Sequence, residues 1–158
     1  MLFRSANGVG NIGTSTTYFN TVFAKATSAQ YADLAEKYTA DVEYEPGTVV
    51  SFGGDAEVTK STTNGDRRVA GVVSTNPAYI MNAGADGESV VQVALLGRVP
   101  CNVVGIISKG DRLVSSDIPG VAQALNPTLY NPGCIIGKAL ENYNSNQVGT
   151  IEVVVGRL

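Results

Sequence analysis

The chain has 158 residues, a hydrophobic content of 44%, a charged content of 16% and a formal net charge of −3. This length corresponds to one domain, or one domain with an extension, and is sufficient for a hydrophobic core. The lack of a basic run argues against a nucleic-acid partner. The lack of histidine removes the commonest general base and the commonest zinc ligand, so we expect no metal and no cofactor. No apolar segment approaches the roughly 20 residues that cross a bilayer, so we expect no membrane insertion.

Residues 1–25 are rich in Gly, Asn, Thr and Ser. The glycines Gly8, Gly10 and Gly13 predict turns and loose extended structure rather than helix. The aromatic side chains of Tyr18 and Phe19 follow, and so short a segment cannot bury them alone. We therefore expect an extended, fibrous lead that packs on the next domain or on neighbouring chains.

Residues 28–38 carry the one convincing helix pattern of the chain. Thr27 or Ser28 is a suitable N-cap, and Tyr31, Leu34 and Tyr38 recur at helical spacing. A helix of about three turns is marginal alone, so its apolar stripe must pack on something. Two arrangements stay open: a bundle of equivalent helices around a symmetry axis, or a helix lying on its own β domain.

Asp33 and Glu36 form the best acidic pair of the sequence. On a helix, residues three apart are neighbours, and in a close-packed oligomer two carboxylates raise each other's proton affinity and can act as acid and base. The alternative is a solvated helix face on which Lys37 balances charge. Elsewhere, Ser115, Ser116 and Asp117 cannot form a Ser-His-Asp triad without histidine, and a turn is the simpler interpretation.

From residue 44 onward the chain is predicted to be β, because short runs rich in Val, Ile and Thr alternate with glycine turns. The fold class is therefore mainly β, a compact sandwich or barrel-like knob. Cys101 and Cys134 lie in apolar, strand-like contexts and are expected to be buried thiols rather than a disulfide. The predicted strands are GTVVSF, AEVTKS, RRVAGVVS, SVVQVALLG, RVPCNVVGI, DRLVS, CIIGKALE and GTIEVVVGRL.

The two halves of this β region show a weak internal sequence similarity, or echo. YEPGTVVSF, an Ala/Val strand and VAGVVS resemble SKGDRLVS, GVAQAL and IIGKALE. In both copies a glycine turn opens a strand, and a later strand carries Gly71 or Gly137. The echo indicates either a duplicated β unit or the chance recurrence that glycine-rich β sequences produce.

The order of motifs resembles the C-terminal β domains of phage tail fibre and neck appendage proteins. The resemblance covers nearly the whole chain. It is carried by NIGTSTTYFNTVFA, ATSAQYADLAEKY, YEPGTVVSFGG, VAGVVSTNPAYIMN, ALLGRVPCNV, GDRLVSSDIPGVAQA, IIGKALE and GTIEVVVG. It implies a homotrimer at the tip of a virion fibre, with assembly and host attachment as its function.

Some members of that family are intramolecular chaperones that cut themselves off the fibre. Their cleavage motif resembles Ser-Asp-Tyr-Ala-Glu, and the matching stretch here supplies both acids, Asp33 and Glu36. Ala32 stands where the motif has Ser, and Leu34 replaces Tyr. We therefore rank a retained structural domain above a self-processing one, in which Asp33 and Glu36 would be catalytic.

These observations predict three segments. Residues 1–25 are the remnant of a fibre shaft, 26–43 a trimerising helix and linker, and 44–158 the β-rich knob. Tyr31, Leu34 and Tyr38 are predicted to meet at the trimer axis. The expected partners are two further copies of the chain, the upstream shaft and a host surface receptor. The loops at 62–68, 82–88 and 126–133 carry side chains suited to glycan or protein contact, or to ordinary solvated turns.

Overall fold

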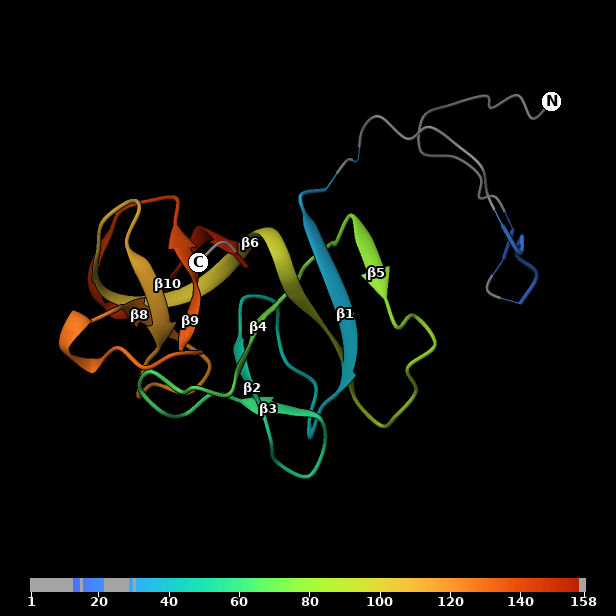
Figure 1. Cartoon of the computed structure of the whole chain (residues 1–158), viewed down its shortest axis with the longest axis horizontal. Coiled ribbons are helices and arrows are strands. Elements are labelled where there is room, and N and C mark those ends of the chain that lie inside the picture. Colours follow the sequence, from blue (N-terminus) through green and yellow to red (C-terminus); the bar gives the residue numbers. More distant parts are fainter. Residues whose placement is uncertain (1–12, 15, 22–28, 30, 157–158) are drawn as a thin grey trace.

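The computed structural model describes residues 13–14, 16–21, 29 and 31–156. The fold is mainly β, as predicted, and the ten strands found among these residues form one continuous hydrogen-bonded system (Figure 1). A short 3-10 turn, η1 (Pro127–Leu129), is the one helical element within the described ranges, where no helix is long and apolar enough to cross a bilayer. The strands are β1 (Asp33–Thr39), β2 (Val49–Phe52), β3 (Val58–Lys60), β4 (Val69–Val73), β5 (Tyr79–Met81), β6 (Val90–Ile107), β7 (Arg112–Ser115), β8 (Ala122–Ala124), β9 (Ile135–Ala139) and β10 (Tyr143–Val155).

Strand β6, 18 residues long, is shared by two groups of strands. Its first part pairs antiparallel with β1 and β4, and β4 continues through β2 to β3. A parallel bridge between Ala40 and Val58 brings β3 back to the end of β1. These elements form the first barrel, and β5 adds to it by pairing parallel with β1.

The second part of β6 closes another ring of strands. It pairs antiparallel with β10, and the ring continues through β9, β7 and β8. A parallel pair between Val103 and Ala122 returns β8 to β6. We call this ring the second barrel. Figure 1 shows β6 crossing from the green and cyan strands of the first barrel to the orange and red strands of the second.

The two barrels repeat the same pairing pattern, which confirms the duplicated β unit. Strands β2, β3 and β4 correspond to β7, β8 and β9, and each set has one register shift, after Val50 and after Leu113. The turn bonds repeat as well. The amide of Gly47 donates to the carbonyl of Val73, and that of Gly110 donates to the carbonyl of Ala139, both at 2.8 Å.

Gly71 and Gly137 occupy equivalent sites, as the sequence echo suggests. Each lies across from the register shift of its barrel. A Cβ on Gly71 would lie 2.6 Å from the carbonyl oxygen of Ala94, and one on Gly137 would collide with the carbonyl oxygen of Val154. Because the neighbouring backbone comes so close, a side chain at either position would push two paired strands apart.

The predicted helix over 28–38 is wrong where the structure describes it, because Asp33–Thr39 form β1. This strand pairs with β6 over its whole length and with β5 along its other edge. Residues 28 and 30 lie outside the described residues. Pairing on both edges satisfies backbone groups that a three-turn helix would satisfy internally, and such non-local partners override a weak helical preference. The β fold thus begins no later than Asp33, and the expected division of the chain at residue 44 stays a prediction.

The core consists of two groups of small branched side chains. One fills the first barrel around Val50, Val58 and Val93, and the other fills the second barrel and continues into the space between the two. Cys101 and Cys134 are free and fully buried, which confirms the prediction of two buried thiols. Burial raises the pKa of the Cys101 thiol to about 12.

A row of outward-facing side chains runs across four paired strands of each barrel, and its polarity and exposure differ between the two barrels. In the first barrel the row consists of Val49, Val72, Ala94 and Ala35, which oppose one another in register and are at most 1% exposed. Three of them pack in the same core group as the inside of the second barrel. In the second barrel the equivalent row is Arg112, Lys138, Val154 and Arg98, and all three of its basic residues are exposed. The second barrel therefore covers the outside of the first.

We predict that exchanging residues between these rows has unequal effects. Val72→Lys places an unpaired charge in a fully buried position, so the free energy of unfolding should fall by at least about 3 kcal/mol. Lys138→Val changes the equivalent exposed position and should shift it by no more than about 0.5 kcal/mol. Urea unfolding followed by circular dichroism measures both. Equal effects of the two substitutions would contradict the assigned covering of the first barrel.

Candidate functional site

Two of the three loops expected to make contacts lie side by side. Loop 62–68 and loop 126–133 enclose a hollow of 650 Å³. Their approach is close, since a Cβ on Gly133 would lie 3.1 Å from the carbonyl oxygen of Arg67. The third loop, 82–88, lies elsewhere, because the side-chain amide of Asn82 donates to the carbonyl of Lys37 on β1 at 3.0 Å. The side chains that line the hollow include those of Thr63, Asn64, Arg67, Arg68, Asn131 and Pro132.

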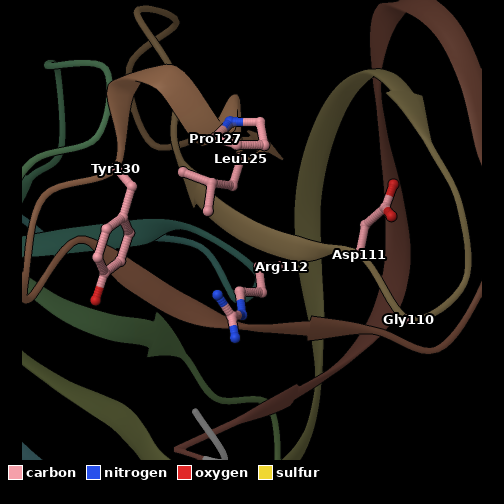
Figure 2. A pocket seen from close by; sticks show the side chains of 6 residues that line it. All are labelled: Gly110, Asp111, Arg112, Leu125, Pro127 and Tyr130. Atoms are coloured by element: carbon pink, nitrogen blue, oxygen red, sulfur yellow. The ribbon is translucent and has the colours of Figure 1, made fainter.

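A second hollow, of 460 Å³, borders the same loop 126–133. Figure 2 shows Tyr130, Leu125 and Arg112 grouped together, whereas Asp111 lies apart from them. Tyr130 is 51% exposed, and η1 positions it directly after Leu129. We call loops 62–68 and 126–133 with their two hollows the loop surface. It offers guanidinium donors, amides and an aromatic ring to a partner.

Loop 62–68 is held to the second barrel by hydrogen bonds, one of which is buried. The backbone amide of Asp66 donates to the Ser115 hydroxyl at 2.9 Å, and that hydroxyl donates to the carbonyl of Thr63 at 2.7 Å. The Asp117 carboxylate accepts from the amide of Asn64 at 3.2 Å. Ser115 and Asp117 therefore both hold loop 62–68 in place through hydrogen bonds.

Asp66 fixes the conformation of the same loop. Its side chain, 7% exposed, accepts hydrogen bonds from the backbone amide, Nε and Nη2 of Arg68 at 2.9, 3.1 and 3.1 Å. Burial by itself would raise the pKa of Asp66, but the hydrogen bonds from Arg68 outweigh it and lower that pKa. The carboxylate is thus charged at neutral pH and orients Arg68 at the rim of the larger hollow.

The structure does not bring Asp33 and Glu36 together. Residues three apart on a strand point to opposite faces, so the neighbourhood expected on a helix is absent. Glu36 instead accepts a hydrogen bond from the Tyr38 hydroxyl at 2.8 Å. Burial, followed by this bond, raises the pKa of Tyr38 to about 12. Asp33 is buried and lies in a separate cleft on the other face of β1.

The three residues expected at a trimer axis have different surroundings. Tyr38 packs edge-on against Phe52, with ring centroids 5.7 Å apart, and borders the core of the first barrel. Tyr31 is 47% exposed, and Leu34 is half-buried. Leu34 opposes two exposed apolar side chains in register, Tyr79 on β5 and Leu96 on β6. The sequence could not single out Tyr79 and Leu96, because only strand pairing brings them next to Leu34.

Comparison with known proteins finds similarity among solved structures. No protein-family model matches the chain, and no curated protein matches it. One similar solved structure is the head fiber gp8.5 N base of bacteriophage phi29, with a TM-score of 0.42 and 16% sequence identity. The match covers 78% of this chain and 96% of that one.

We predict that Asp66 makes loop 62–68 sensitive to acid. Its folded-state pKa lies below the ordinary 3.8, so its stabilisation is present above that pH and is lost as the pH falls through the lowered value. Asp66→Asn should reduce the free energy of unfolding by about 1–3 kcal/mol at pH 6, and by less at pH 3. Urea unfolding at both pH values measures this, with the exposed Asp55→Asn as the control. A deficit of equal size at the two pH values would contradict the assignment.

Proposed function

We propose that this chain is the distal domain of a phage tail fibre or appendage, which assembles as a homotrimer and attaches the virion to its host. The proposal is supported by the order of sequence motifs along almost the whole chain. The compact β fold is of a kind suited to a protease-resistant knob. Residues 1–25 would join it to the upstream shaft.

The observation that carries the proposal is an exposed apolar row formed by Tyr79, Leu34 and Leu96. These side chains oppose one another across β5, β1 and β6, and Tyr79 and Leu96 are 65% and 44% exposed. Paired positions across strands share one face of a sheet, so the three form a contiguous patch. Exposed apolar patches are typical of interfaces, and a second and third copy of the chain would cover this one.

In this arrangement the loop surface stays available to a receptor. In Figure 1, loop 126–133 lies at the end of the molecule farthest from β1 and β5. Loops on a rigid scaffold commonly carry binding functions, since they vary without disturbing the core. The trimer would therefore assemble through the apolar row and present three copies of the loop surface outward.

We predict that the purified chain is a trimer in solution. Light scattering after size-exclusion chromatography should give three times the chain mass of 16.4 kDa. Tyr79→Ser combined with Leu96→Ser should convert it to a folded monomer, because both changes remove apolar contact from the proposed interface. Ile106→Ser, at a 75% exposed position of the second barrel, is the matched control and should leave the trimer intact. A monomer at micromolar concentration for the unaltered chain would refute the trimer.

We predict that the loop surface carries attachment. An excess of the purified domain should compete with the parent phage for adsorption to its host cells. Arg112→Ala with Tyr130→Ala should weaken this competition at least about tenfold, since interface Arg and Tyr side chains often dominate binding. Glu88→Ala, in the distant loop 82–88, is the control. Full competition by the Arg112/Tyr130 double variant would locate attachment elsewhere.

A further inference from the structure

A cleft between the two barrels contains two buried polar atoms without a hydrogen-bond partner. They are Oδ2 of Asp33 and Oγ of Ser74, and each residue is 6% exposed. Both residues line the same cleft, which has a volume of 320 Å³. Its other polar side chains include Asn76, Arg98 and Glu152, and Tyr31 adds an aromatic ring.

Backbone hydrogen bonds fix the main chain of both residues. Asp33 opposes Gly97 in the β1–β6 pair, and its carbonyl accepts from the amide of Ala78 at 2.7 Å. The amide of Ser74 donates to the carbonyl of Gln92 at 2.7 Å. The carboxylate and the hydroxyl are therefore presented from strand ends rather than from loops that could turn them toward water.

The fold itself does not require polar side chains at these two positions. By the repeated register, Asp33 corresponds to Leu96, and Ser74 corresponds to Leu140. The correspondence is visible in the contacts. A Cβ added to Gly97 would contact the Cα of Asp33. In the same way, a Cβ added to Gly156 would contact the Cα of Leu96. The amide of Leu140 donates a hydrogen bond to the carbonyl of Glu152, just as the amide of Ser74 donates to the carbonyl of Gln92. The second barrel thus uses leucine where the first has Asp33 and Ser74.

An unpaired buried carboxylate or hydroxyl costs free energy, so native proteins rarely keep one without a purpose. At the equivalent positions of the second barrel, Leu96 is 44% exposed and Leu140 is half-buried, so the backbone fold accepts an apolar side chain there and does not by itself demand a polar one. The cost would be recovered if a side-chain rotation let a molecule bound in the cleft donate to the Asp33 carboxylate and pair with the Ser74 hydroxyl.

We propose that the cleft binds a neutral saccharide unit. Sugar hydroxyls donate to Asp33 and Glu152 and accept from Arg98, while Ser74 and the Asn76 amide can do either. The Tyr31 ring offers an apolar surface for the carbon-bound hydrogens of a sugar ring. Two carboxylates disfavour an anion, and Arg98 disfavours a free cation. A volume of 320 Å³ falls at the small end of ligand sites, roughly 300–1,000 Å³, which suits one or two sugar rings.

This site goes beyond the proposed function, because it lies apart from the loop surface and does not depend on trimer assembly. Its test uses the full chain labelled with ¹⁵N. The probes are methyl β-D-glucoside, methyl β-D-galactoside, N-acetylglucosamine and methyl α-L-rhamnoside, each titrated to high millimolar concentration. At least one should cause saturable shifts of the amide signals of Asp33, Ser74 and Arg98. If none of the four does so, the proposal is overturned.

Three variants separate binding from folding. Asp33→Asn keeps the shape of the side chain but removes the charged acceptor, and should weaken the saccharide at least about tenfold. Ser74→Ala should also weaken it while the melting temperature stays equal or rises, because an unpartnered hydroxyl is lost. Asp55→Asn, outside the cleft, should bind as the unaltered chain does. Unchanged affinity in Asp33→Asn would overturn the proposal.

The loop-surface variant distinguishes this proposal from the attachment proposal. Arg112→Ala with Tyr130→Ala should retain full saccharide binding in the cleft, whatever its effect on adsorption. Loss of the saccharide shifts in that variant, with the Asp33→Asn variant unaffected, would assign the sugar to the loops and overturn the cleft site.

Discussion

The shared strand β6 is the constraint on which the rest of the structure depends. Its first part is hydrogen-bonded to β1 and β4, and its second part to β10 and β8. Both of its edges are therefore occupied in each barrel, and neither barrel can close without it. Because one backbone runs through both rings, their relative orientation is fixed by strand pairing rather than by a flexible linker. Loops 62–68 and 126–133 come from different barrels, so their proximity follows from this arrangement.

The duplication explains why the core is asymmetric although the strands repeat. Repeated units bury a face against their neighbour, and an end unit exposes that face to water. In the first barrel the outer row around Val72 is apolar because the second barrel covers it. In the second barrel nothing within the described chain covers the same row, and Lys138 stands at the position of Val72. The outer row is therefore apolar in the covered barrel and basic in the barrel at the end.

Much of the fold was predictable from local sequence. Val- and Ile-rich runs between glycine turns predicted the strands, and the similarity around Gly71 and Gly137 offered a repeated unit as one of two interpretations. The sequence failed where the deciding contacts are distant along the chain. The segment Asp33–Thr39 has helical spacing, yet its partners are residues 90–97 and 79–81, which local pattern does not show. Likewise SVVQVALLG and RVPCNVVGI predict two strands, whereas the structure has the single strand β6. Pairing with β1 and β10 continues through Gly97, and the sequence does not show these partners.

The candidate sites show the same limit and also a way past it. The sequence pairs Asp33 with Glu36, but strand β1 separates the two, and the fold places Asp33 in the same cleft as Ser74, 41 positions along the chain. No spacing rule connects such residues. Comparison of the two barrels does connect them, because equivalent positions have the same backbone pairing even where their exposure to solvent differs. Where both barrels carry a glycine, as at Gly71 and Gly137, the backbone explains it. Where one carries leucine and the other a buried, unpartnered polar group, the backbone does not, and the difference points to a partner outside the chain.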